Sequence, residues 1–112
     1  MRKGKMIAQG AHASLGAVFL IQDSDEDQYD ISVRAAAFDW INGMFAKICV
    51  SVNSEQELLQ VYTAAEAAGL PVKLITDSGL TEFHGVPTKT CLAIGPAWAD
   101  DIDKITGNLP LL

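Results

Sequence analysis

The segment from residue 4 to residue 21 most constrains the fold, because its side chains repeat with the period of an α-helix. Four apolar residues at helical spacing form a stripe that we expect to dock on a core: Ile7, Ala11, Leu15 and Val18. A neighbouring arc of about 60° carries Lys5, Gln9, His12 and Gly16. The pattern predicts a helix that buries one face and presents a cation, an amide and an imidazole beside it.

The start of this helix is basic, although a helix N-terminus already carries partial positive charge. Arg2, Lys3 and Lys5 lie there, and their repulsion costs up to about 1 kcal/mol. Exposed backbone amides and side-chain cations that converge in this way are suited to an anionic ligand. The helix start therefore predicts an anion site.

The net charge of −6 argues against a nucleic-acid partner, but its distribution changes that conclusion. Five of the fourteen acidic residues fall within residues 23–30, and the rest of the chain is close to neutral. Three of the eight basic residues fall within the first five positions. We interpret the acidic run as a solvated loop and the helix start as a basic corner.

Size and composition predict one globular domain over residues 1–112. We expect a cytoplasmic protein with no membrane partner, because no run of about 18 apolar residues occurs and the N-terminus lacks the apolar core of a signal peptide. Cys49 and Cys91 lie in apolar runs, which predicts two buried thiols. No set of side chains has metal-ligand spacing, so we expect neither a metal nor a cofactor.

Hydrophobic periodicity predicts helices at residues 4–21, 31–42, 54–68 and 98–106, and strands at residues 46–52, 72–76 and 88–94. Asp30 is the candidate N-cap of the second helix and Gly43 its end. Ser54 and Glu57 form a capping box for the third, which Gly69 ends in a left-handed conformation.

This order predicts an α/β fold, a single-domain α/β/α sandwich in which helices flank a small mixed sheet. Three strands form a thin sheet for that many helices. A further strand before Met1 would complete the sheet, so we expect that the sequence begins late.

Four ordered segments resemble the signature of the type 2 peptidyl-tRNA hydrolase family, and together they span nearly the whole chain. The first helix carries its Gly-Lys, Ala-Gln and His-Ala pairs at Gly4-Lys5, Ala8-Gln9 and His12-Ala13. Residues 74–81 resemble its Asp-Ala-Gly-x-Thr loop, with Ser78 in place of the commoner Ala. Residues 88–96 resemble its Thr-x-Thr-x-x-Ala-Ile-Gly-Pro strand, and residues 103–109 its closing helix and tail.

The resemblance implies a mixed four-stranded sheet flanked by helices, usually in a homodimer. Family members cleave the ester that joins a peptide to the terminal ribose of tRNA, so the implied partner is the acceptor end of peptidyl-tRNA, or of tRNA carrying an N-blocked amino acid. With the basic helix start, the match predicts catalytic roles for Lys5, His12, Asp77 and Thr81. The predicted substrate-binding residues are Arg2, Lys3, Gln9, Thr88 and Thr90.

Ester hydrolysis needs an activated water and a group that stabilises the developing oxyanion. Asp77 is the predicted residue that orients water or accepts its proton, and His12 ranks below it as a base. Lys5 is expected to neutralise the oxyanion or a terminal phosphate. Gln9 can hold a carbonyl, a ribose hydroxyl or the neighbouring loop, and the sequence leaves these alternatives open.

Three features favour an alternative function, a non-catalytic module that binds tRNA or a protein on the same scaffold: the acidic run at residues 23–30 and two departures from the family pattern. The first strand of the family is absent, so either the chain start is misassigned or the sheet is incomplete. Glu82 replaces the usual Gln after the loop threonine and adds a carboxylate near Asp77. Serine hydrolases and nucleotide-hydrolysing enzymes are disfavoured, because the chain has neither a Gly-x-Ser-x-Gly elbow nor a P-loop.

Overall fold

The computed structural model describes residues 1–19, 22–25, 28–31, 35–80 and 83–112. Its helices are α1 (Lys3–Phe19), α2 (Ala35–Asn42), α3 (Glu55–Ala67) and α4 (Ala99–Thr106). Its strands are β1 (Gln22–Asp25), β2 (Gln28–Ile31), β3 (Val72–Asp77) and β4 (Thr88–Ile94). In this part of the chain, no helix is both long and apolar enough to cross a membrane.

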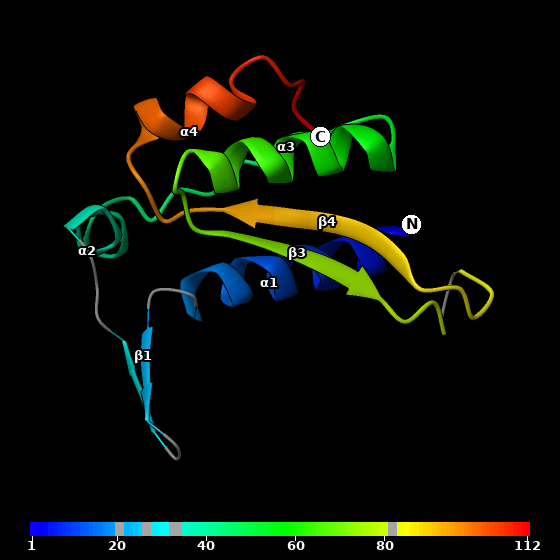
Figure 1. The fold of residues 1–112 in the computed structure, drawn as a ribbon, viewed down its shortest axis with the longest axis horizontal. Coiled ribbons are helices and arrows are strands. Elements are labelled where there is room, and N and C mark those ends of the chain that lie inside the picture. Colours follow the sequence, from blue (N-terminus) through cyan, green and yellow to red (C-terminus); the bar gives the residue numbers. More distant parts are fainter. Residues whose placement is uncertain (20–21, 26–27, 32–34, 81–82) are drawn as a thin grey trace.

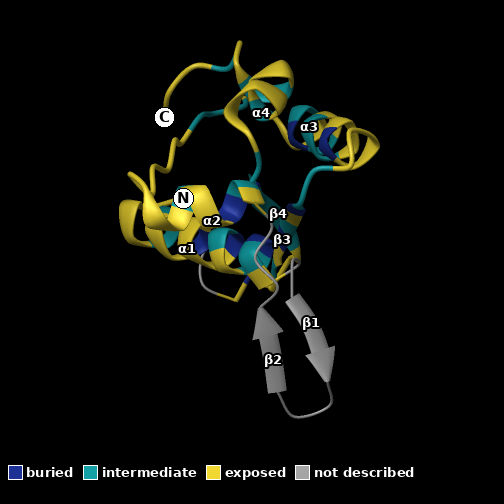
Figure 2. Ribbon diagram, turned by 90° about the vertical axis from the view of Figure 1, so that its left-hand side faces the viewer, coloured by how far each residue is buried: buried dark blue, intermediate teal, exposed yellow. Residues whose placement is uncertain are grey.

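The fold is mixed α/β, with the β3–β4 pair between two helical layers (Figure 1). β3 and β4 are antiparallel, α1 covers one face of the pair, and α3 with α4 lies over the other. The buried apolar side chains of the described residues include Ala13 and Ala17 of α1, Ile75 of β3 and Ala65 of α3. Figure 2 shows buried segments of the ribbon in α1, in α3 and in the strand pair. This arrangement confirms the predicted fold class.

The prediction that the apolar stripe of α1 with Ile7 and Leu15 docks on the core is wrong. Ile7 and Leu15 are 72% and 58% exposed, whereas Gln9, Ala13 and Ala17 are buried. Small residues let the helix approach the strands closely: a β-carbon on Gly16 would lie 2.7 Å from Cγ of Lys73 in β3. The polar Gln9 tolerates burial because its amide finds partners on the strands. Close approach and hydrogen bonding thus outweigh burial of the larger apolar side chains.

The capping signals of α3 are confirmed. The hydroxyl of Ser54 accepts a hydrogen bond from the backbone N–H of Glu57 at 3.1 Å, and the Glu57 carboxylate accepts one from Asn53 at 2.9 Å. At the other end Gly69 has φ +72°, and it and Leu70 donate to carbonyls of the last helical turn. The predicted bounds of β4 and of the helix ending at residue 106 also agree with the structure.

The acidic run does not form the predicted loop. Its described residues form the antiparallel hairpin β1–β2, in which Asp23 pairs with Asp30. Backbone pairing does not require apolar side chains, so a polar run can form a ladder where the chain reverses. The second helix consequently begins at Ala35 rather than at Ile31, and Asp30 is a strand residue instead of its N-cap. Residues 20–21 and 32–34 lie outside the described part.

Residues 46–52 do not form the predicted strand. Only Val50 takes part in a bridge, with Leu111, and Leu112 donates a backbone hydrogen bond to the carbonyl of Cys49 at 3.0 Å. The C-terminal tail therefore occupies backbone groups of this segment, while β3 and β4 pair with each other. Cys49 is exposed in consequence and Cys91 is half-buried, so neither thiol is as enclosed as predicted.

The Ser54 cap generates a stability prediction. Ser54→Ala should lower the free energy of unfolding by about 1 kcal/mol, because the N–H of Glu57 loses its acceptor. Ser54→Asp keeps a side-chain oxygen at this position and should change stability little. Urea denaturation of the two variants would test this, and equal losses in both would show that the cap contributes nothing.

Candidate active site

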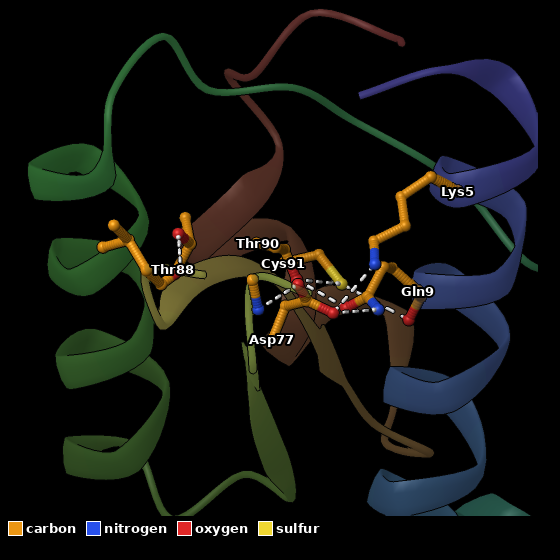
Figure 3. Close-up of polar contacts among 8 residues, drawn as sticks. Lys5, Gln9, Asp77, Thr88, Thr90 and Cys91 are labelled. Carbon is orange, nitrogen blue, oxygen red and sulfur yellow. Dashed lines mark hydrogen bonds and ion pairs between the residues drawn. The ribbon is translucent and has the colours of Figure 1, made fainter. Parts of the chain in front are cut away.

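An ion pair joins the first turns of α1 to the end of β3. Nζ of Lys5 lies 2.9 Å from Oδ1 of Asp77, and only 16% and 11% of the two side chains are exposed (Figure 3). The helix places Lys5 toward the strands because it lies one turn before the buried Gln9. Asp77 is the last residue of β3, where the strand gives way to a turn.

The turn after β3 orients the carboxylate. Oδ2 of Asp77 accepts the backbone N–H of Gly79 at 2.8 Å, as Asp side chains often do in turns. Gly79 has φ +86°, and a β-carbon there would collide with the carbonyl oxygen of Val86. Only glycine therefore fits, because any other side chain would push away the donor that holds Asp77.

Gln9 connects Asp77 to β4. Its Nε2 donates to Oδ1 of Asp77 at 3.4 Å, and its Oε1 accepts the Thr90 hydroxyl at 2.7 Å (Figure 3). The thiol of Cys91 donates to the backbone carbonyl of Gln9 at 3.3 Å. Lys5, Gln9, Asp77 and Thr90, all predicted as site residues, are thus brought together. Cys91 was missed as a member of this cluster, because its apolar sequence context indicated only a buried thiol.

Electrostatics keep Asp77 ionised. The hydrogen bond from Lys5 lowers the pKa of its carboxyl most, the Gly79 N–H lowers it further, and desolvation opposes both. A carboxylate has about four acceptor positions. Among the described residues, the donors from Lys5, Gln9 and Gly79 take three of these positions, and the fourth, on Oδ2, can accept a further donor such as water. The cluster can therefore orient a water molecule beside a cation.

Other predicted site residues lie outside this cluster. Arg2 and Lys3 are exposed at the start of α1, and His12 is exposed farther along the same helix. Thr88 is the cross-strand partner of Asp77, but its hydroxyl donates to the carbonyl of Val86 at 2.9 Å instead of to a residue of the cluster (Figure 3). Thr81 and Glu82 lie outside the described residues. The functional roles of these residues remain predictions.

Metal-binding side chains do not gather in the described part of the chain. No group of three or more histidine, cysteine, aspartate or glutamate side chains is placed there so that it could hold a metal ion.

Comparisons with known proteins identify similar sequences over the full chain. The family model described as Peptidyl-tRNA hydrolase PTH2 matches residues 1–112. The peptidyl-tRNA hydrolase of Methanopyrus kandleri is 38% identical over 112 residues, which are 100% of this chain and 88% of that protein. The peptidyl-tRNA hydrolase of Methanocaldococcus jannaschii is 40% identical over 100% of this chain and 90% of that protein. The peptidyl-tRNA hydrolase of Halobacterium salinarum is 42% identical over 99% of this chain and 88% of that protein.

The lowered pKa of Asp77 predicts how stability depends on pH. A carboxyl with a depressed pKa stabilises the fold above its unfolded-state pKa of about 4, and this contribution is lost as the pH falls through the folded-state pKa. When the pH is lowered from about 5 to about 2, the free energy of unfolding should therefore fall less in Asp77→Asn than in the wild type. At neutral pH it should be the less stable protein, because Lys5 loses its charged partner.

Urea unfolding across this pH range measures the effect. Asp101→Asn is the matched control, since Asp101 is 49% exposed in its side chain and its ion pair with Lys104 is long, at 3.8 Å. The control should retain the acid dependence of the wild type. Asp77→Asn with an unchanged acid dependence would contradict the role given to the ion pair.

Proposed function

The chain belongs to the type 2 peptidyl-tRNA hydrolase family, and we propose that the Lys5–Asp77 pair is the centre at which it cleaves the ester between a peptide and the terminal ribose of tRNA. The observation that carries this assignment is the ion pair at 2.9 Å between a largely buried cation and a largely buried, ionised carboxylate at the end of β3. Family membership supports the hydrolase over the non-catalytic binding module.

Asp77 acts on the attacking water. The open position on Oδ2 accepts a hydrogen bond from water and aims the water oxygen at the ester carbonyl carbon. Attack by the water oxygen gives a tetrahedral intermediate with negative charge on the former carbonyl oxygen. Its collapse breaks the bond to the ribose oxygen, and the proton released by water passes through Asp77 to that oxygen. Because a low pKa makes Asp77 a weak base, orientation of the water is the larger part of its role.

Lys5 stabilises the negative charge that develops on the ester carbonyl oxygen. Its ammonium lies 2.9 Å from Oδ1 of Asp77, next to the position proposed for the attacking water. A flexible point charge next to the reacting carbonyl suits this task. Arg2 and Lys3, exposed at the start of the same helix, bind the phosphates of the acceptor end, where backbone amides add further donors.

The remaining predicted residues complete the proposal. Thr81 supports the Asp77 loop, His12 is a second candidate base, and the Thr88 hydroxyl is a candidate substrate contact. The expected substrates include tRNA bearing an N-blocked amino acid as well as peptidyl-tRNA. We expect residues 1–112 to form one peptidyl-tRNA hydrolase domain, which the family match over the same residues supports. We also expect it to act in the cytoplasm, where translation takes place, and to need no cofactor.

We further propose that the protein acts as a homodimer. The outward face of α1 is apolar, with Ile7 72% and Leu15 58% exposed. Contiguous patches of large exposed apolar side chains are typical of surfaces that bind another protein. A second copy of the chain would remove these side chains from water.

Hydrolysis of N-blocked aminoacyl-tRNA tests the catalytic assignment. Asp77→Asn should lower kcat by about 10²- to 10⁴-fold through loss of water orientation and proton acceptance. Lys5→Met should lower it by about 10²-fold or more through loss of charge stabilisation. Asp101→Asn and Lys104→Met make the same chemical changes at an exposed pair and should match the wild type. Wild-type turnover in either site variant would reject the assignment.

Sedimentation velocity tests the dimer. Leu15→Lys should shift the wild-type dimer to a monomer, because burying an unpaired ammonium at an interface is costly. Leu111→Lys is the matched control, since Leu111 is 75% exposed on the C-terminal tail, and it should sediment as the wild type does. A monomeric wild type, or a dimeric Leu15→Lys protein, would exclude this face as the interface.

A further inference from the structure

β4 contains an irregularity next to the candidate active site. Ile75 of β3 pairs with Cys91, but the next residue, Thr76, pairs with Lys89, so Thr90 has no partner in the register. Between these two pairs β4 advances by two residues while β3 advances by one, which is a β-bulge. Bulges alter the direction of a strand's side chains and occur often beside active sites.

The bulge explains an unusual pair of contacts. Successive side chains of a regular strand point to opposite faces. Thr90 and Cys91 are successive residues, yet both reach Gln9 on α1: the Thr90 hydroxyl donates to Oε1 at 2.7 Å and the Cys91 thiol donates to the backbone carbonyl at 3.3 Å (Figure 3). The strand therefore holds both the side chain and the backbone of a single helical residue.

We propose that Thr90 and Cys91 are positioning residues, which use the bulge to fix the orientation of the Gln9 amide toward Asp77. This inference deepens the proposed function and rests on it for its catalytic meaning. The Asp77 carboxylate can only accept, so Nε2 of the amide faces Oδ1, and the Thr90 hydroxyl holds the other end of the amide by donating to Oε1. The reversed amide would direct its carbonyl oxygen at the carboxylate. Thr90 therefore acts through Gln9, in addition to the substrate contact predicted from the sequence.

The thiol is suited to its part in this arrangement. Burial raises the pKa of Cys91, so the group stays protonated at neutral pH and remains a hydrogen-bond donor. The Cys91 thiol bonds to the backbone of Gln9, the same residue whose side chain the Thr90 hydroxyl holds. Among the described residues, the other titratable groups in contact with this network are Lys5 from α1 and Asp77 from β3.

Removal of the Thr90 hydroxyl should change the titration of Asp77. In Thr90→Val the Gln9 amide loses the bond that fixes it, so Asp77 loses a donor or faces a carbonyl oxygen. Either change disfavours the carboxylate and should raise the pKa of Asp77 by about half a unit. Carbon-detected NMR titration of the Asp77 carboxyl in the full chain measures this shift. Hydrolysis at neutral pH should fall about tenfold in kcat, because the water beside Asp77 is held less well.

Conservative variants separate positioning from general damage. Thr90→Ser retains the hydroxyl and should restore both the pKa of Asp77 and kcat. Thr106→Val makes the same isosteric change in α4, where the hydroxyl bonds to the Ile102 carbonyl, and should affect neither quantity. Cys91→Ala should lower kcat and Cys91→Ser, which keeps a donor, should recover most of it.

The NMR titration does not depend on turnover, so the two proposals fail separately. A shifted Asp77 pKa in Thr90→Val, with no hydrolysis by the wild type, would support the positioning role and reject the proposed function. Normal hydrolysis by the wild type, with an unshifted Asp77 pKa in Thr90→Val, would overturn the positioning role alone. Failure of Thr90→Ser to restore the wild-type values would also overturn it.

Discussion

The ion pair between Lys5 and Asp77 connects parts of the chain that are 72 residues apart. Both side chains are largely withdrawn from water, where an unpaired charge is costly, so each requires the other in place. Pairing sets the rotation of α1 against the end of β3, and the Gly79 N–H sets the rotation of the carboxylate. The local fold and the proposed chemistry therefore depend on the same contact.

The contact between α1 and the strands is polar at its centre, which has structural consequences. Gln9 is buried and bonded on several sides, and the small residues Ala13 and Ala17 extend the same face. Close packing of this kind places the amide beside Asp77 and leaves Ile7 and Leu15 on the outside. The buried face of α1 therefore lies at the site, and Ile7 and Leu15 lie on its exposed face.

Local signals in the sequence predicted local structure well. The Ser54 cap, the left-handed Gly69 and the bounds of β4 follow from side-chain chemistry within a few residues. The failures depended on distant partners. Periodicity could not show that small residues would carry α1 onto the strands, nor that the C-terminal tail would take backbone groups of residues 46–52. Motif resemblance selected Lys5, Gln9, Asp77 and Thr90, but a bulge that turns Cys91 toward Gln9 leaves no local signal.

The most direct test of this account is a crystal structure of the protein bound to a 3′-peptidyl-adenosine analogue in which an amide replaces the ester. We expect the acyl carbon to lie beside Oδ2 of Asp77, with a water molecule between them. Nζ of Lys5 should lie within hydrogen-bond distance of the acyl oxygen. An analogue bound with its acyl group away from both side chains would contradict the assignment of this pair as the catalytic centre.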